Sequence, residues 1–157
     1  MEITQNYLKE HFDYKDGHLI VKKTGNIKTE TPINKAHRYH RAVIKNKVYV
    51  IHRLIFLFHY GYLPKIIDHI DNDRTNNKIE NLREATQQQN CINRKLHKTN
   101  KSGCKNVFWH SSMKKWSVSF SVNAKRKNFG FFDDLELADL VAIEARNLYH
   151  GPYACHF

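Results

Sequence analysis

The sequence predicts an α+β fold in two parts, and three observations support this prediction. Short runs of alternating apolar and polar residues, separated by turn residues, predict antiparallel strands. Two apolar runs with helical spacing, one ending at Gly61 and one at Gly151, predict helices. A polar linker at 97–101 separates an N-terminal part, 1–96, from a C-terminal part, 102–157. A chain of 157 residues can bury one modest core or two small ones.

The N-terminal part should open with a short helix and two hairpins. Residues 3–12 suit a helix, and "FDYKDGHLIVKK" predicts a hairpin that turns at 15–17. A second hairpin is expected in "YHRAVIKNKVYVIHR", with its turn at 45–47. The apolar stretch "HRLIFLFHYG" then predicts a helix that Gly61 closes.

Residues 66–96 predict a strand, a loop, a second strand and a helix, in that order. "KIIDHI" is an apolar strand, and "IENLREA" is the second strand. Between them, "DNDRTNN" has the composition of a loop, because Asn and Asp side chains bond their own backbone in turns. Thr86 and Gln89 form a T-x-x-Q capping box, which predicts a helix from Gln87 to about Leu96. The stretch is therefore expected to form a ββα unit.

The C-terminal part should form a three-stranded antiparallel sheet with one helix on its apolar face. The predicted strands are "CKNVFWHS", "KKWSVSFSV" and "KRKNFGFF", with a turn at 123–124 before the third. The middle strand alternates strictly, so its Trp, Val and Phe side chains should share the face toward the core. Asp133 and Glu136 predict the start of the helix, and Gly151-Pro152 predicts its end.

The formal net charge of +11 implies a polyanionic partner, and nucleic acid is the first candidate. Between Cys91 and Gly130 there are ten Lys or Arg residues and no Asp or Glu. A membrane surface is the rival partner, but no strongly basic amphipathic helix supports it. The longest apolar run is too short to cross a bilayer and no secretory signal is visible, so we expect a cytoplasmic protein. The three cysteines lack C-x-x-C spacing, which argues against a zinc ribbon or a disulfide framework.

Asp68, His69 and Asn90 supply groups that phosphodiester hydrolysis requires. A base must activate water, and a divalent cation must stabilise charge on the phosphate and the leaving oxygen. Mg²⁺ takes oxygen ligands, so one carboxylate and one amide oxygen can hold it. Neighbouring residues on a regular strand point to opposite faces, so Asp68 and His69 need a twisted strand end to serve one site. Taken alone, an Asp-His pair is more often a surface pair, and an Asn-rich loop is usually a turn.

The stretch "HRLIFLFHYGYLP…IIDHIDNDRTNNKIENLREATQQQNCINR" resembles the HNH endonuclease family, in the branch found in phage and intron-encoded enzymes. The resemblance implies a ββα-metal finger in which Asp68 and Asn90 are metal ligands and His69 is the general base. It matches Asn81 to the Asn in the middle of the family's His-Asn-His motif, which pins the finger loop and helps to orient the histidine. Many members have a second His where this chain has Asn90, and a neutral oxygen donor favours Mg²⁺, or Mn²⁺, over zinc.

Other polar residues near the finger have less specific roles. His52-Arg53 matches the family's recurring H-R-L, and Arg53 is expected either to contact DNA phosphate or to pack at the helix start. Arg94 is also predicted to contact DNA, as part of the basic segment that follows the finger. Loop structure is the main role predicted for the remaining loop residues, which are Asp71, Asp73, Asn76 and Asn77.

Residues 102–151 resemble the APETALA/ethylene-response-factor DNA-binding domain. The matching landmarks are Gly103, Val107, Trp116, Gly130, Phe132-Asp133 and an Ala-rich helix. The last helix is acidic and the strands are basic, so the polar face of the sheet should meet DNA, with strands in the major groove. By position, the resemblance assigns DNA contacts to Lys105, Ser119, Ser121, Arg126 and Asn128. Two of these are Ser where plant members tend to have Arg, so sequence specificity is expected to be weak or to lie elsewhere.

The combined prediction is a phage-type or homing-type, metal-dependent endonuclease of double-stranded DNA in a phage-infected or bacterial host cell. The N-terminal part would cut and the C-terminal part would hold DNA. One site is visible, so a monomer should nick one strand. Cutting both strands needs a homodimer or a second binding event. No protein partner is evident. The main alternative is a DNA-binding regulator whose finger is only a scaffold. An RNA-binding protein ranks third, because it needs exposed aromatics on the sheet and the alternation should bury them.

Overall fold

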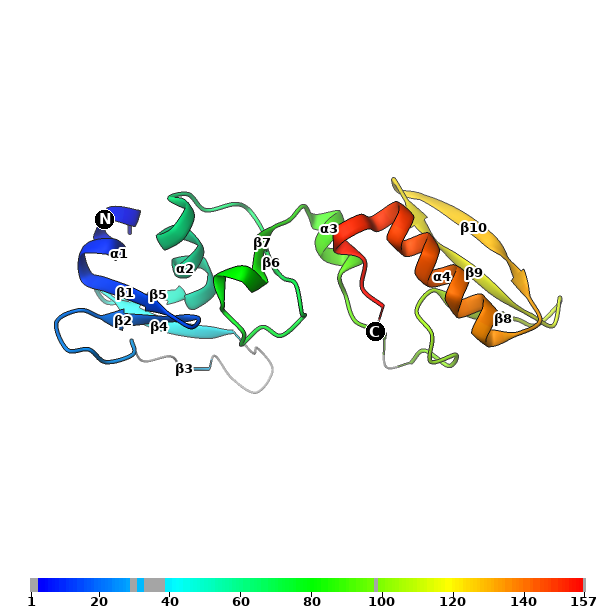
Figure 1. The fold of residues 1–157 in the computed structure, drawn as a ribbon, viewed down its shortest axis with the longest axis horizontal. Coiled ribbons are helices and arrows are strands. Elements are labelled where there is room, and N and C mark those ends of the chain that lie inside the picture. The colour runs from blue at the N-terminus through cyan, green and yellow to red at the C-terminus, as the bar shows by residue number, and fades with distance from the viewer. Residues whose placement is uncertain (1–2, 29–30, 33–38, 98, 157) are drawn as a thin grey trace. The chain divides into compact units, whose positions relative to one another are not determined.

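The structure is a computed structural model that describes residues 3–28, 31–32, 39–97 and 99–156. Its helices and small antiparallel sheets confirm the α+β class (Figure 1). The chain divides into two compact units, Met1–Gln87 and Gln88–Phe157. The predicted linker at 97–101 lies within the second unit, and its role as a domain boundary stays a prediction. Among the described residues, no helix is long and apolar enough to span a bilayer.

The first unit begins with a helix and two hairpins, as predicted. Its elements are α1 (Gln5–His11), β1 (Phe12–Lys15), β2 (His18–Val21), β3 (Thr31–Pro32), β4 (His40–Ile44), β5 (Lys47–Val50), α2 (Ile51–Tyr60), β6 (Ile67–His69), the 3₁₀ helix η1 (Ile79–Asn81) and β7 (Leu82–Glu84). Both hairpin turns are two residues long, Asp16-Gly17 and Lys45-Asn46, and all four residues have positive φ. This backbone twist matches that of the flanking strands, which is why such turns favour hairpins. Lys47 pairs with Ile44 and so belongs to β5, not to the turn.

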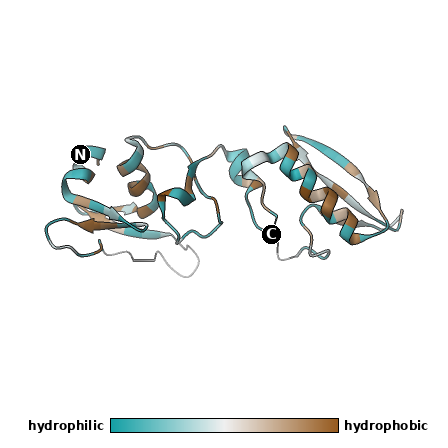
Figure 2. Ribbon diagram, viewed as in Figure 1, coloured by the Kyte–Doolittle hydropathy of each residue, from teal (hydrophilic) through white to brown (hydrophobic). Residues whose placement is uncertain are grey.

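The helix α2 forms the centre of the core of the first unit. Ile51, Leu54 and Ile55 are almost fully buried, and α2 packs against α1, β2, β4 and β5. Figure 2 shows the apolar residues along α2. Gly61 ends the helix with a φ of 78°, a left-handed conformation that glycine adopts without steric cost. The same helix packs against η1, so the core supports the finger loop from one side.

The ββα unit has the predicted order, with two differences. In β6–β7, Asp68 lies opposite Arg83 and His69 lies opposite Leu82. The second strand begins later than predicted, because its first residues form η1. The helix α3 (Gln87–Ile92) ends before the predicted Leu96. The ammonium group of Lys105 accounts for this end, because it bonds the carbonyl oxygens of Ile92 and Arg94 where a further helical turn would otherwise satisfy them.

The second unit is a three-stranded sheet with one helix packed on it, as predicted. Its elements after α3 are β8 (Val107–His110), β9 (Lys115–Val122), β10 (Lys125–Phe132), α4 (Leu135–His150) and the 3₁₀ helix η2 (Gly151–Tyr153). The strand order is β10-β9-β8, all antiparallel, and α4 packs against all three strands. Val107, Val118 and Ala142 have no exposed surface and form the core with Ala138. Gly151 caps the helix at its predicted end.

Two details of the second unit differ from the predictions. The N-cap of α4 is Asp134, not Asp133, because the Asp134 carboxylate accepts the backbone N–H groups of Glu136 and Leu137. The sheet face away from the core is also not entirely polar. Phe108 and Phe131 both lie beside Ser117 on that face, and Phe108 is 45% exposed. The expectation that the alternation buries every sheet aromatic is therefore wrong, because it considered only the middle strand.

Candidate active site

The strand β6 carries the two residues at the centre of the site, and both are buried. Asp68 is 5% exposed and His69 is 4% exposed. Their side chains meet different groups, as expected for neighbours on a strand. Both Nη2 and Nε of Arg83 lie within 2.9 Å of Asp68 Oδ2, and the Nε2 of His69 lies 3.3 Å from Asn77 Oδ1. The hairpin thus holds a carboxylate and an imidazole side by side, each with its own polar partner.

Burial favours the neutral form of His69. Removal from water lowers its pKa below the usual 6.5, although the bond to Asn77 and the Asp71, Asp68 and Asp73 carboxylates each raise it. A general base must be deprotonated before it can accept a proton. Burial therefore keeps His69 in the state that a base requires, while the neighbouring carboxylates can stabilise the charge that forms when it accepts the proton.

Asn77 determines which ring nitrogen of His69 can act. Its Oδ1 can only accept, so the Nε2 of His69 carries the proton in this contact and Nδ1 is the basic nitrogen. Asn77 is itself only 3% exposed. The prediction assigned it mainly to loop structure, and the structure adds a direct contact with the candidate base. Sequence alone gave no signal that separates Asn77 from Asn76 beside it.

Aromatic rings surround the other sides of His69. The His52 ring stands edge-on at 5.0 Å between centroids, and the Tyr39 ring lies 5.9 Å away. The pKa of His52 is lowered to about 3, mainly by burial, with smaller contributions from His69 and Arg53. The first turn of α2 thus places a second neutral imidazole against the first. Its Nδ1 has no hydrogen-bond partner among the described residues.

Two cations lie near this cluster. Arg53, the predicted phosphate contact, is partly buried and donates to the carbonyl oxygen of Pro64 at 3.4 Å. This bond shows packing at the helix start, and the phosphate contact stays a prediction. The exposed Arg74, which the sequence analysis did not single out, lies 5.1 Å above the ring of Tyr39. The loop sequence alone does not predict this contact, because the contact depends on how the loop folds over Tyr39.

Asn81 bonds two residues of the finger loop, and its role in the site stays a prediction. Its Nδ2 donates to Asp71 Oδ1 at 2.9 Å and to the carbonyl of Asn76 at 2.8 Å, and its Oδ1 accepts the N–H of Asp71. Burial raises the pKa of Asp71, but hydrogen bonds from Asn76, the backbone of Asp73 and Asn81 outweigh it and bring the pKa below 3.8. Asp71, Asp73 and Asn76 thus have the loop role that was predicted for them.

The first hairpin supports the loop that carries Asn77. The hydroxyl of Tyr14 accepts the N–H of Ile79 at 2.9 Å, across 65 positions of sequence. Gly17 has a φ of 86°, and a Cβ there would lie 3.0 Å from the backbone nitrogen of Lys78. Only glycine allows the hairpin turn to approach the loop this closely. This contact gives the N-terminal residues a function in the site, which the sequence had left open.

Arg83 is the site residue that the sequence analysis missed. Opposite charges at facing positions of an antiparallel pair are a known stabilising arrangement, so aligning "IIDHI" with "NLRE" could have found it. Arg83 directs both nitrogens at one oxygen of Asp68. This ion pair fixes the carboxylate.

The two predicted metal ligands suit a hard cation by their chemistry. The carboxylate of Asp68 and the amide oxygen of Asn90 are donors that Mg²⁺ accepts, with water completing its shell. Asn90 lies in α3, beyond the division at Gln87, so neither unit by itself contains both ligands. In the described part of the chain, no three His, Cys, Asp or Glu side chains form a group that could hold a metal ion.

Four of the predicted DNA contacts share the outer face of the sheet in the second unit. The strand register places Arg126 beside Ser121, and Asn128 beside Ser119. Arg126 Nη2 donates to the buried hydroxyl of Ser119 at 2.7 Å, and the Arg126 side chain is exposed. These residues keep their DNA role as a prediction.

The other two predicted contacts of this unit differ from each other. Arg94 is exposed. Lys105 is half-buried, and its ammonium group is used by the carbonyl oxygens of Ile92 and Arg94. Burial lowers the pKa of Lys105. The structure therefore gives Lys105 a role inside the unit, and its DNA contact stays a prediction.

Three comparisons relate this chain to known proteins. A family model described as HNH endonuclease matches residues 49–91, a segment that includes Asp68, His69, Asn81 and Asn90. A solved structure that concerns DNA binding and cleavage by the HNH homing endonuclease I-HmuI is 24% identical, with a TM-score of 0.46, and the match covers 82% of this chain and 78% of that chain. Protein 3.8 of Escherichia phage T7 is 35% identical over 96 residues, which are 60% of this chain and 78% of that protein. On the family-model match and the identity to the phage protein, this chain belongs to the HNH endonuclease family.

Proposed function

We propose that this protein is a metal-dependent DNA endonuclease in which His69 is the general base. The observation that carries the proposal is the state of His69. It is buried and bonded through Nε2 to Asn77, within the segment that matches the HNH endonuclease model, and burial lowers its pKa, which favours the neutral form that a base requires.

The proposed reaction is hydrolysis of one phosphodiester bond. His69 Nδ1 accepts a proton from a water molecule, and the water oxygen forms a bond to phosphorus in line with the leaving group. The bond from phosphorus to the 3′ oxygen breaks, and that oxygen takes a proton from solvent. Asn77 keeps the imidazole in the reactive tautomer throughout, and Asn81 keeps the loop in place.

Asp68 and Asn90 would hold the divalent cation, with Mg²⁺ or Mn²⁺ suited to their oxygen donors. When bound, the cation supplies positive charge that stabilises the phosphate and the leaving oxygen. Arg83 fixes the carboxylate of Asp68 through the ion pair at 2.8 Å. The acidic side chain is thereby held in one position before any cation arrives.

The second unit would hold double-stranded DNA, and its weak set of base-reading residues fits a nuclease with low sequence specificity. Arg126 and Lys125 are exposed on the β10 strand, and Ser121 and Asn128 lie on the same face as Arg126. Serine hydroxyls cannot make the paired guanine contact that arginine makes. With one catalytic histidine, one chain nicks one strand, and a double-strand break needs a second copy or a second visit.

The test is nicking of supercoiled plasmid by the full chain, with Mg²⁺ or with EDTA. The wild-type chain is compared with His69→Ala and with His69→Gln, which better preserves the buried volume. The control is His11→Ala, because His11 is exposed on α1 and lies outside the site. Thermal unfolding of each variant shows whether it is folded.

The expected result is an open-circle product that requires the metal, is lost in both His69 variants and is retained in His11→Ala. A loss on the order of 100-fold or more matches removal of a general base. If folded His69 variants nick as fast as the wild-type chain, the assignment of the base is wrong. If no variant cuts any plasmid while all bind duplex DNA, the chain is a DNA-binding regulator and the proposal fails.

A further inference from the structure

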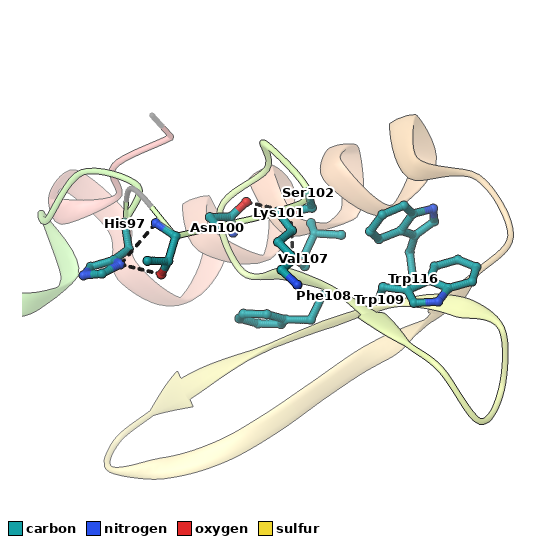
Figure 3. A pocket seen from close by; sticks show the side chains of 9 residues that line it. His97, Asn100, Lys101, Ser102, Val107, Phe108, Trp109 and Trp116 are labelled. Carbon is teal, nitrogen blue, oxygen red and sulfur yellow. Dashed lines mark hydrogen bonds between the residues drawn. The ribbon is translucent and has the colours of Figure 1, made fainter.

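The second unit contains a cavity that the nuclease site does not use. It has a volume of about 500 Å³ and lies between His97, residues 99–102 and the strand β8 (Figure 3). This volume is in the usual range of small-ligand sites, roughly 300–1,000 Å³. The strand β8 is an edge strand of the sheet, so the cavity opens beside an unpaired strand edge.

The chain's two tryptophans form one wall of this cavity. Trp109 and Trp116 face each other across β8 and β9, with ring centroids 5.0 Å apart at an angle of 67°. Figure 3 shows both indoles together at one side, with Lys101 nearer the middle and the Phe108 ring at the other side. Trp116 also packs against the core, which fixes it, whereas Trp109 is 53% exposed. The wall thus combines one ring that the core holds in place, Trp116, with one ring that is exposed to solvent, Trp109.

The opposite wall is held in place by its own hydrogen bonds. The hydroxyl of Ser102 donates to the carbonyl of Val107 at 2.8 Å, which ties the loop to β8. The side chain of Asn100 donates to the carbonyl of Cys104 at 3.2 Å and accepts the N–H of Gly103 at 2.8 Å. Because these hydrogen bonds fix Asn100 and Ser102 without a ligand, this part of the wall is formed before anything binds.

Charge indicates what the cavity binds. All of its lining residues lie within 97–116, inside the segment from Cys91 to Gly130 that has ten Lys or Arg and no acid. The exposed Lys101 is part of the wall. An aromatic surface with a lysine beside it suits a flat base attached to a phosphate backbone. An acidic or neutral apolar ligand would use only one of these two features.

We propose that this cavity binds an unpaired nucleobase of a DNA strand, stacked on Trp109, with Lys101 near the adjacent phosphate. The inference rests on the proposed function and specifies its substrate as DNA with a locally unpaired strand. Bases inside a duplex already stack on their neighbours, so a base must leave the stack to enter the cavity. An unpaired base enters without that cost.

The test uses the full chain in EDTA, so that no DNA is cut. Because both tryptophans line the cavity, their fluorescence reports its occupancy directly. The probes are a short oligothymidylate, an abasic oligomer of the same length and charge, a duplex, and an oligouridylate. Binding is also followed by anisotropy of labelled oligomers for the wild-type chain, Trp109→Leu and Trp116→Phe. The control is Leu148→Ala, which removes an equally apolar side chain that is 75% exposed on α4.

The expected result is quenching by oligothymidylate but not by the abasic oligomer. Trp109→Leu should bind the oligothymidylate about tenfold more weakly, and Leu148→Ala should bind it normally. Equal quenching by the abasic oligomer, or unchanged affinity of Trp109→Leu, would overturn the inference, as would tighter binding of oligouridylate than of oligothymidylate. If oligothymidylate fails to quench while plasmid nicking persists, the cavity inference alone fails. If it quenches as expected while nicking is absent, only the nuclease proposal fails.

Discussion

The β6–β7 region of the first unit and the sheet of the second unit differ in how far their polar side chains are buried. Around β6 and β7, polar residues are buried and bond one another: Asp68 with Arg83, His69 with Asn77, and Asn81 with its loop. On the β10 strand of the second unit, Lys125, Arg126 and Lys127 are exposed, whereas Lys105, in the loop before β8, bonds backbone carbonyls. The β6–β7 region therefore buries its polar groups, and the β10 strand keeps its cations at the surface.

This difference follows from what each region is proposed to do. A catalytic base must hold one tautomer and one position, and burial with hydrogen bonds provides both. A DNA-holding surface works through long, mobile cations that displace counterions, and it tolerates imprecise placement. Substitutions in the first region should therefore change rate and stability steeply. Substitutions on the second surface should change affinity gradually and in a salt-dependent way.

The largest effect is expected for Asn77→Ala. Loss of the contact at Nε2 frees the imidazole to adopt the wrong tautomer, and the nicking rate should fall on the order of 100-fold. The hydrogen bond to Asn77 raises the pKa of His69, so its removal lowers that pKa further. The acid limb of the pH–rate profile should therefore move to lower pH, which plasmid nicking between pH 5 and 8 would measure.

Asn76→Ala is the matched control for this prediction. Asn76 is adjacent in the loop, but its side chain donates to Asp71 and not to His69. It should lower stability and leave the position of the acid limb unchanged. If both variants give the same acid limb, Asn77 has only the structural role that its loop composition predicts.

The next effect concerns stability at low pH. His52 has a pKa of about 3 when folded, against about 6.5 when unfolded. Between these values the unfolded chain binds one more proton, so stability is full above pH 6.5 and falls as the pH decreases. The loss is about 1.4 kcal/mol per pH unit, or about 2 kcal/mol between pH 7 and pH 5. Urea unfolding at both pH values, followed by circular dichroism, would measure it.

His52→Phe tests whether this loss belongs to His52. The variant keeps a ring in the buried position but cannot take up a proton, so its stability should depend on pH less steeply by about the same 2 kcal/mol. The lowered pKa of His69 acts in the same direction and remains in the variant. An unchanged pH dependence would mean that His52 is accessible to water in solution.

Much of the fold could be predicted because its signals are local. Hairpin turns, the helix α2 with its closing Gly61, and the alternation in β9 each depend on residues close in sequence. Asp68 and His69 could also be singled out, because they are adjacent and stand before a loop of Asn and Asp. In each case the chemistry and the geometry come from the same short segment.

The remaining features depend on contacts between distant segments. Tyr14 reaches Ile79 across 65 positions, and nothing in either segment predicts the bond. The end of α3 at Ile92 depends on Lys105, which belongs to a later loop. Asn77 could not be separated from its neighbours, because four polar residues of one loop look alike until the fold places one of them at His69. Tertiary contacts, not composition, assign these roles.

The smallest effect is expected on the outer sheet face, where Arg126→Ala should weaken duplex binding about fivefold, about 1 kcal/mol. The slope of log affinity against log salt concentration should become shallower by about one unit, because one fewer counterion is released.

Lys105→Met is the variant to compare with Arg126→Ala. The Lys105 ammonium group bonds two backbone carbonyls, so its removal should lower stability and leave the salt dependence of DNA binding unchanged. Anisotropy of a labelled duplex between 50 and 200 mM salt, in EDTA, would measure the salt dependence of both variants. A reduced salt dependence in Lys105→Met would show that this lysine leaves its carbonyls for phosphate, and the contrast between fixed and mobile polar groups would then fail within the second unit.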